Sequence, residues 1–275
     1  MGSSDPVCAV RVERIAPLDP TMNRVTFAVA QGELPETVRI PAGHCRLFFP
    51  DPRAPLRFWP RVFTYRRWHR DGRFDVDFAL HGGKGPAALW IARAVPGDLL
   101  GWKHGGAPKL TLEAPPAGPI VAYGDGAALP VISALLERAQ PALTGHVVLD
   151  LPRAARPTPV HAPTGVSVWR LRQATLSETL ETVRTHGANR PATVFVVCEA
   201  GRMRALRRLA LDEWRVPQER VFTSGYWKAG LSSEQVDAAK RLPDWFGDDV
   251  GQMTSNRNPD FGGKAQPAGG GPAPS

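Results

Sequence analysis

The stretch from Glu113 to Pro119 is the feature that most constrains the fold, because it separates two different hydrophobic patterns. Before it, short runs alternate apolar and polar residues between Pro- and Gly-rich turns, which is typical of antiparallel strands in a barrel or sandwich. After it, short apolar strands alternate with helical segments, which favours a doubly wound parallel sheet. We therefore expect an antiparallel six-stranded β-barrel over residues 1–115 and an α/β domain over residues 119–230.

The two patterns also predict individual elements. Before the break, strands are expected at 7–12, 24–29, 38–40, 45–49, 61–65, 74–80 and 99–102, with a helix at 85–93. After it, strands are expected at 120–123, 145–151, 166–171 and 193–198, an edge strand at 221–222, and helices at 129–138, 176–185 and 202–214. A C-terminal extension over 231–250 contains one more predicted helix. Residues 251–275 are rich in Gly, Pro, Ser and Asn, which is typical of a disordered tail.

Arg61-Val62-Phe63-Thr64 follows a Pro-rich lead-in and carries three side chains suited to a flat, anionic cofactor. An arginine can pair with a phosphate through two parallel hydrogen bonds. An aromatic ring can cover the face of a ring system, and a threonine hydroxyl can hydrogen-bond its edge. The alternative is an ordinary edge strand with solvated arginines.

A Gly-rich turn follows the strand expected at 74–80. It reads His81-Gly-Gly-Lys-Gly-Pro-Ala-Ala-Leu-Trp90, and Pro86 suits the first turn of a helix. A strand that runs through glycines into a helix can bring backbone N–H groups close to a phosphate. The alternative is a plain tight turn.

Strand ends of the predicted parallel sheet carry further candidates, because ligands of such sheets bind at the carboxyl ends of the strands. Small residues at 124–128 would let a pyrophosphate approach a helix start. Arg153, Arg156 and Arg172 could hold a 2′-phosphate, which would favour NADPH over NADH. Cys198 and Glu199 end another strand. For these positions a plain connection, a solvated basic loop and a buried structural cysteine remain alternatives.

Six motifs, in order, resemble the siderophore-interacting proteins, a family of FAD-dependent, NAD(P)H-linked ferric-siderophore reductases in the ferredoxin-reductase-like group. They cover roughly residues 8 to 230. The motifs are RVFT (61–64), DVDFALHG with GPAALW (75–90), YGDGAALP (123–130), VWRLR (168–172), EAG with RALRR (199–208) and SGYWKAG (224–230).

The resemblance, combined with the motifs above, implies an FAD-binding barrel and an NADPH- or NADH-binding α/β domain. In the barrel we expect cofactor contacts from Arg61, Val62, Phe63, Thr64, Asp77, His81, Gly82, Gly85, Pro86, Ala87 and Trp90. In the α/β domain we expect them from Asp125, Ala127, Ala128, Arg172, Glu199, Tyr226 and Trp227. Lys103 and Lys228 are expected to bind the substrate, a ferric siderophore or another small electron acceptor. No side-chain acid or base is required, so no catalytic residue is assigned.

The chain departs from the family pattern at two positions. It has Gly126 where the family carries an acidic residue beside the nucleotide, and Phe63 where the family carries a tyrosine. Phenylalanine can still stack on a ring, but one hydrogen bond is lost, which costs about 1 kcal/mol. We expect flavin binding to tolerate that loss.

The composition limits the classes of partner that the chain can bind. A net charge of +8 favours anionic ligands, but zinc-finger spacings and RNA-binding aromatic signatures are missing, so we expect no nucleic-acid partner. Three scattered cysteines, Cys8, Cys45 and Cys198, offer no metal-ligand spacing and fit a reducing compartment. No apolar run approaches the length of a membrane span. We expect a cytoplasmic monomer that binds no metal and no membrane.

Two other functions fit the same residues. The flavin could pass its electrons to a different acceptor, such as a partner oxygenase or an organic substrate. The chain could also be a non-catalytic protein that binds a flavin or a ferric chelate through basic residues such as Lys84, Lys103, Lys109 and Lys228.

Overall fold

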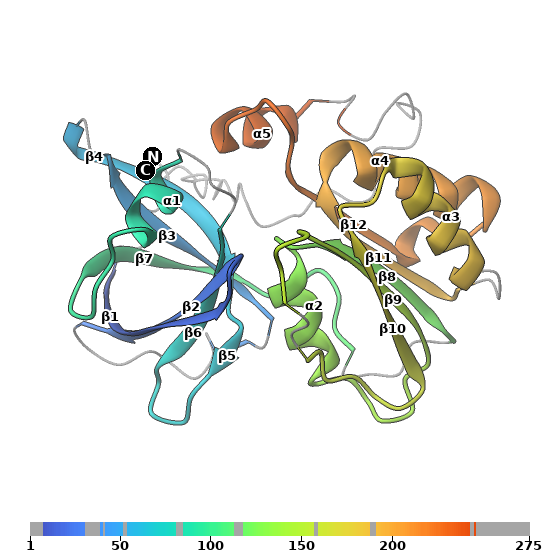
Figure 1. The fold of residues 1–275 in the computed structure, drawn as a ribbon, viewed down its shortest axis with the longest axis horizontal. Coiled ribbons are helices and arrows are strands. Elements are labelled where there is room, and N and C mark those ends of the chain that lie inside the picture. Colours follow the sequence, from blue (N-terminus) through green and yellow to red (C-terminus); the bar gives the residue numbers. More distant parts are fainter. Residues whose placement is uncertain are drawn as a thin grey trace, which may run out of the picture.

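A computed structural model describes residues 8–30, 39–40, 42–51, 54–80, 85–112, 118–156, 159–187, 191–242 and 245. They form two sheets that lie side by side, one antiparallel and one parallel with helices on its faces (Figure 1). The predicted fold class, an antiparallel barrel followed by a doubly wound α/β domain, is confirmed. The predicted tail at 251–275 and the glycine-rich residues 81–84 lie outside the described residues.

The N-terminal sheet has seven strands in the order β4-β3-β7-β1-β2-β6-β5, and every pairing is antiparallel. It curls so that β4 also contacts β6. Its elements are β1 (Cys8–Asp19), β2 (Met22–Val29), β3 (His44–Asp51), β4 (Ala54–Thr64), β5 (Arg67–Trp68), β6 (Phe74–Ala79), helix α1 (Pro86–Ile91) and β7 (Leu99–Gly106). Strand β5 was not expected from the sequence, because two residues are too few to show an alternating pattern.

Two predicted strand boundaries are wrong, because both strands continue through a proline. The lead-in before Arg61 was expected to be a connection, yet β4 begins at Ala54 and runs through Pro60. β4 is the edge strand of the sheet, where proline's missing N–H costs no ladder hydrogen bond. Similarly, β1 continues to Asp19 through Pro17, where its pairing with β2 shifts register. Arg39 and Ile40, expected in a strand, lie outside any strand.

The parallel sheet has the order β10-β9-β8-β11-β12. Its elements are β8 (Ile120–Asp125), α2 (Leu129–Leu136), β9 (Gly145–Leu151), β10 (Val166–Arg172), α3 (Leu176–Gly187), β11 (Thr193–Glu199), α4 (Ala200–Arg208), β12 (Val221–Trp227) and α5 (Ser233–Ala239). The last strand was expected to cover only residues 221–222. It is seven residues long and includes Gly225, Tyr226 and Trp227.

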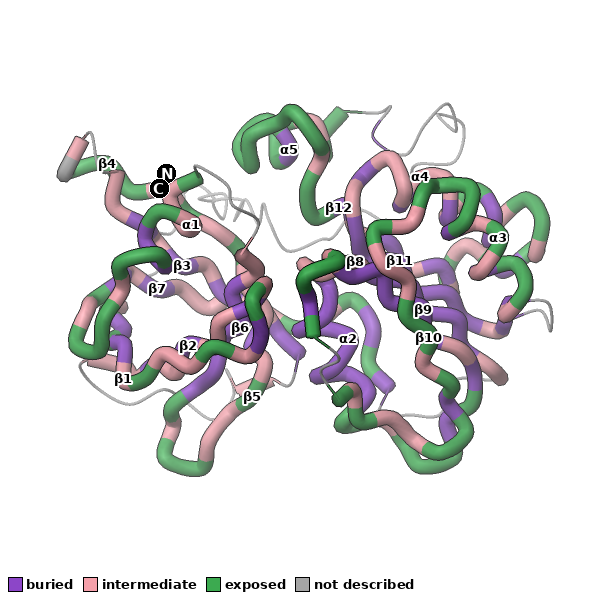
Figure 2. Tube along the Cα trace, viewed as in Figure 1, coloured by how far each residue is buried: buried purple, intermediate pink, exposed green. Residues whose placement is uncertain are grey.

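Three apolar clusters hold these layers together. One fills the barrel around Phe27, Phe49 and Phe74. A second joins α2 and one face of the parallel sheet to Met22, Ala42, Leu110 and Leu112 on the barrel side. The third packs α4, Val236 of α5 and Trp245 against the opposite face. The central strands of the parallel sheet are accordingly buried along most of their length (Figure 2).

A charged network also crosses between the two sheets. Arg66, just after β4, donates to Glu137 at the end of α2, with 2.7 Å between Nη1 and Oε2. The same guanidinium lies 3.8 Å from Asp77 of β6. The Asp77 side chain is 4% exposed and accepts two hydrogen bonds from Arg24, at 2.7 and 2.9 Å. Arg66 therefore links the barrel to helix α2 through a site that excludes most water.

Replacing Arg66 with methionine is expected to lower the free energy of unfolding by about 3 kcal/mol, because breaking a buried ion pair leaves uncompensated charge. The matched control is Arg184→Met. Arg184 pairs with Glu213, and both side chains are about half exposed, at 48% and 49%. That change should cost about 1 kcal/mol or less. Urea unfolding followed by circular dichroism measures both, and equal losses would contradict a structural role for the Arg66 network.

Two histidines lie at one end of the barrel. His44 begins β3, opposite Thr64 and Gly106. His104 of β7 places its Nδ1 atom 3.3 Å from the Tyr65 hydroxyl. Burial lowers the pKa of both histidines below 6.5, and for His44 the nearby His104, Arg46 and Lys109 lower it further. Both imidazoles are therefore neutral at pH 7.

Stability should fall as the pH drops from about 7.5 to 5.5, since the unfolded chain takes up protons near pH 6.5 that the folded histidines refuse. Each histidine contributes at most about 1.4 kcal/mol over that interval. His44→Asn should reduce this loss without removing it, because His104 still titrates. Urea unfolding at three pH values tests this, and a wild-type stability that does not change with pH would refute it.

Candidate functional site

The carboxyl ends of β8 and β11 meet at the point where the strand order of the parallel sheet reverses. From β8 the chain moves outward to β9 and β10, then returns to β11 and β12 on the other side. Such a switch point leaves a crevice at the strand ends, where ligands of open α/β sheets bind. Asp125 ends β8 and Glu199 ends β11, so two residues predicted from the sequence lie there together.

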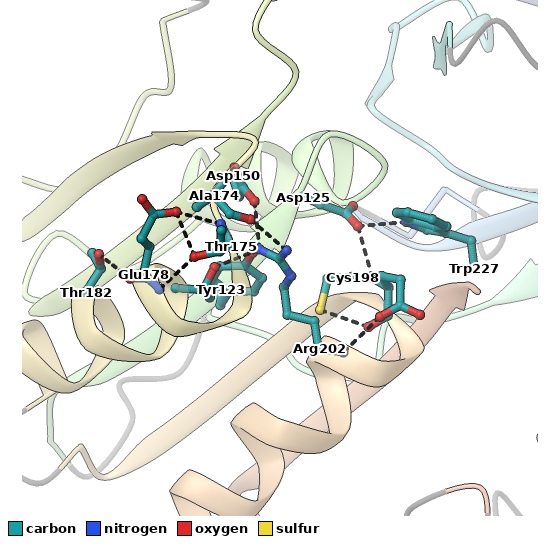
Figure 3. Close-up of polar contacts among 12 residues, drawn as sticks. Tyr123, Asp125, Asp150, Ala174, Thr175, Glu178, Thr182, Cys198, Arg202 and Trp227 are labelled. Atoms are coloured by element: carbon teal, nitrogen blue, oxygen red, sulfur yellow. Dashed lines mark hydrogen bonds and ion pairs between the residues drawn. The ribbon is translucent and has the colours of Figure 1, made fainter. Parts of the chain in front are cut away.

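The Asp125 carboxylate lies where the ends of β8, β11 and β12 meet (Figure 3). One oxygen, Oδ1, accepts a hydrogen bond from the Ala127 backbone N–H at 3.0 Å. The other, Oδ2, accepts from the Glu199 backbone N–H at 3.0 Å and from the Trp227 indole N–H at 2.7 Å. One side chain thus connects the ends of β8, β11 and β12.

Burial dominates the electrostatics of Asp125. Removal from water raises the pKa of the carboxyl above its ordinary value, while the hydrogen bonds from Trp227, Ala127 and Glu199 oppose that rise. Three hydrogen bonds from the protein occupy most of the acceptor positions of the carboxylate. Its role in the crevice is to fix the loop after β8 and to orient Trp227, whose side chain is 43% exposed.

Cys198 and Glu199 lie directly before helix α4. The Glu199 side chain caps α4 by accepting from the Arg202 N–H at 2.9 Å. The Cys198 thiol is buried and donates to the Glu199 carbonyl at 3.4 Å. Burial raises the pKa of this thiol, so it stays protonated.

Arg202 organises the contacts beneath the strand ends, a role that the sequence did not indicate. Its Nη1 atom donates to Tyr123 at 3.0 Å, to Asp150 at 2.8 Å and to Thr179 at 2.7 Å. Its Nη2 atom donates to the Ala174 carbonyl at 2.8 Å (Figure 3). It joins strands β8 and β9 to the start of α3 beneath the crevice. An acidic residue near the end of β9 and an arginine just after β11 were the only signals in the sequence.

Arg172, expected at a 2′-phosphate, holds a loop instead of facing free solvent. Its Nη1 atom donates to the Ala155 carbonyl at 2.7 Å and lies 3.4 Å from the Pro152 carbonyl. These contacts shape the loop after β9, on which Arg153 and Arg156 are exposed. Gly126 faces the same loop, because a Cβ atom there would lie 3.2 Å from Pro152.

Strand β4 carries the barrel half of the site. Arg61 and Phe63 point to one side of the strand and Val62 to the other, where it is 56% exposed. The Phe63 ring packs on Phe78, with centroids 4.5 Å apart. At the end of β4 the Thr64 hydroxyl interacts with Tyr226 of β12. This contact brings the predicted barrel motif against the strand ends of the α/β domain.

Several other residues that are predicted to contact the cofactor also pack against the protein. Trp90 is 5% exposed and stacks on Phe27 in the barrel core. Asp77 is held by arginines, as described above, and Ala128 is fully buried beside α2. Ala87 packs against the barrel cluster, and Gly85 and Pro86 begin α1, where a Cβ on Gly85 would meet open space.

The two lysines predicted to bind substrate lie on different elements. Lys103 is on β7, in register with Arg46 of β3. Lys228 follows β12, and its carbonyl accepts from the Leu231 N–H at 3.1 Å. His81 and Gly82 lie outside the described residues.

The donor set at the junction fits a flavin nucleotide. It provides a guanidinium for phosphate at Arg61, a hydroxyl at Thr64 and aromatic faces at Tyr226 and Trp227, which are 38% and 43% exposed. Within the part of the chain that the structure describes, no three His, Cys, Asp or Glu side chains gather into a possible metal site. In the same part, none of the helices has the length and apolar character needed to cross a bilayer.

This architecture, an antiparallel barrel joined to a doubly wound sheet, is a ferredoxin-reductase-like fold. The chain belongs to the siderophore-interacting protein family. A family sequence model of siderophore-interacting proteins matches residues 117–230. A second one, of the siderophore-interacting FAD-binding domain, matches residues 56–107. The resemblance seen in the sequence motifs is thereby confirmed.

Individual relatives agree with this assignment. The ferric vibriobactin reductase ViuB of Vibrio cholerae is 27% identical over 214 residues, which cover 70% of this chain and 78% of ViuB. The siderophore-interacting protein SipS of Aeromonas hydrophila superposes with a TM-score of 0.71 at 27% identity, over 85% of this chain and 97% of SipS. A siderophore-interacting protein of Acinetobacter baumannii gives a TM-score of 0.76 at 20% identity, over 86% and 95%.

Trp227→Phe tests the hydrogen bond to Asp125, because phenylalanine keeps an aromatic ring and removes only the indole N–H. Losing a hydrogen bond to a buried carboxylate should cost about 1.5–3 kcal/mol of stability. The control is Trp169→Phe, since Trp169 is also 43% exposed but stacks on His186 with centroids 3.9 Å apart. Urea unfolding compares them, and similar losses in both variants would rule out a special role for the Asp125 contact.

Proposed function

We propose that the protein is a flavin-dependent NAD(P)H oxidoreductase that reduces ferric siderophores and releases their iron as Fe(II). The observation that carries this proposal is the position of the motif on β4, whose last residue, Thr64, neighbours Tyr226 near the end of β12. The relatives named as ferric vibriobactin and ferric acinetobactin reductases support the reaction. The matching FAD-binding domain supports the cofactor.

On the barrel side, Arg61 would hold a phosphate of FAD and Thr64 would hydrogen-bond the edge of its ring system. Phe63 packs inward on Phe78, so its contribution would be to support the ring from the barrel core rather than to lie free against it. The loss of a tyrosine hydroxyl at position 63 is consistent with this inward position.

On the α/β side, the loop after β8 would receive the nucleotide pyrophosphate, with the Asp125 carboxylate fixing the loop and Trp227. The exposed Arg153 and Arg156, on the loop shaped by Arg172, would pair with a 2′-phosphate. That placement favours NADPH over NADH. Gly126 carries no charge, whereas an acidic residue at this position would repel an anionic nucleotide. The glycine therefore suits nucleotide binding.

FAD, when bound, would supply the redox chemistry, which is hydride acceptance from NAD(P)H and single-electron reduction of two ferric ions. The protein orients the two cofactors, shields them from water and provides electrostatics. Lys103 and Lys228 would attract an anionic ferric chelate. A monomeric state and a cytoplasmic location remain predictions. The three free cysteines agree with a reducing compartment.

An absorption spectrum of the purified protein, recorded before and after anaerobic NADPH or NADH, tests this function. We expect a flavin spectrum that bleaches with the nucleotide and returns when a ferric siderophore is added. Fe(II) released in that step can be trapped by ferrozine and should amount to two ions per NAD(P)H. A reduced flavin that ferric siderophores fail to reoxidise would point to another acceptor. Failure to bind FAD at all would refute the proposal.

A further inference from the structure

Helix α5 lies outside the segment that the family model matches, since that match ends at residue 230. Ser232 and Gln235 cap its first turn reciprocally: Ser232 accepts from the Gln235 N–H, and the Gln235 side chain accepts from the Ser232 N–H. Val236, 2% exposed, anchors the helix in the apolar cluster around α4. In Figure 1, α5 stands above the junction of the two sheets, on the side of β12 that faces the barrel.

From this anchored position α5 reaches the barrel through one ion pair. Glu234, in the first turn of α5, accepts a hydrogen bond from Arg61 of β4 with 2.6 Å between Oε1 and Nη1. The Arg61 side chain is 16% exposed and Glu234 is 43% exposed. The two residues are 173 positions apart in the sequence, so the contact depends entirely on how α5 is placed.

Arg61 is also the residue proposed to hold a phosphate of FAD. Its Nη1 atom donates both to Glu234 and to the Pro60 carbonyl at 2.8 Å. A guanidinium can serve several acceptors, but a carboxylate and a phosphate on the same arginine are like charges at close range. A phosphate that binds Arg61 must therefore displace Glu234 or bear its repulsion.

We propose that Glu234 is a resident anion that sets the strength of flavin binding by competing with the FAD phosphate for Arg61. This inference rests on the proposed flavin site and adds to it a residue outside the family-matched segment. With Glu234 in place, Arg61 is kept oriented, and a ligand is accepted only if its own negative charge outcompetes the carboxylate. Helix α5 thereby makes flavin retention depend on the C-terminal extension.

The test titrates flavin-free protein with FAD and follows the change in flavin fluorescence. Glu234→Gln keeps the size of the side chain and removes its charge, so it should bind FAD about 2- to 5-fold more tightly, the range expected for a partly exposed ion pair. The gain should shrink as salt is raised, because screening weakens the competing charge. Glu213→Gln, which removes the partner of Arg184 far from the junction, is the matched control and should bind FAD as the wild type does.

Two further titrations make the result specific. Riboflavin lacks phosphate, so Glu234→Gln should leave its affinity unchanged. Arg61→Ala should weaken FAD binding, and adding Glu234→Gln to it should give no further change, because the carboxylate then has no arginine to occupy. Equal or weaker FAD binding by Glu234→Gln would overturn the inference while leaving the flavin site standing. If the wild-type protein does not bind FAD, the proposed function fails first, and the two failures are therefore distinguishable.

Discussion

A buried carboxylate organises the strand ends on which the rest of the site depends. Charge removed from water must be compensated locally, and Asp125 meets that requirement with hydrogen bonds from three different segments. Each donor is brought to the same point by the parallel sheet, whose neighbouring strands end side by side. The three hydrogen bonds to the carboxylate therefore fix the loop after β8, the end of β11 and the indole of Trp227 relative to one another. The deeper contacts of Arg202 do the same for β9 and α3.

The junction of the two sheets combines an apolar seam with charged contacts at its rim. The apolar cluster continues from α2 to Leu110 and Leu112 at the end of the barrel segment. Arg66 with Glu137, and Lys109 with the Thr223 carbonyl at 3.2 Å, add directional contacts around it. An apolar seam alone permits sliding, whereas charged contacts fix one register. A reaction between two cofactors held by different domains needs that fixed register, because electron and hydride transfer depend steeply on distance and orientation.

The sequence predicted the two-domain architecture well because each domain has its own hydrophobic period, and period follows directly from strand and helix geometry. It failed where the sheet context reverses a local preference. Pro60 reads as a strand breaker but lies on an edge strand, and the strand expected at 221–222 continues to Trp227 in β12. In the site, Asp125 and Glu199 could be located because strand ends are visible in the pattern. The role of Arg202 could not, since its four partners come from segments up to 79 residues away.

The buried thiols have a consequence for the lifetime of the protein. Fe(II) reacts with peroxide to give hydroxyl radicals, so an enzyme that liberates Fe(II) works beside a source of oxidative damage. Oxidation of cysteine follows thiolate character and exposure. Cys45 and Cys198 are buried, and burial raises the pKa of both thiols, which keeps them protonated. Packing that serves the two cores thus also slows the oxidation of these two thiols by peroxide, which would matter beside the Fe(II) that the proposed reaction releases.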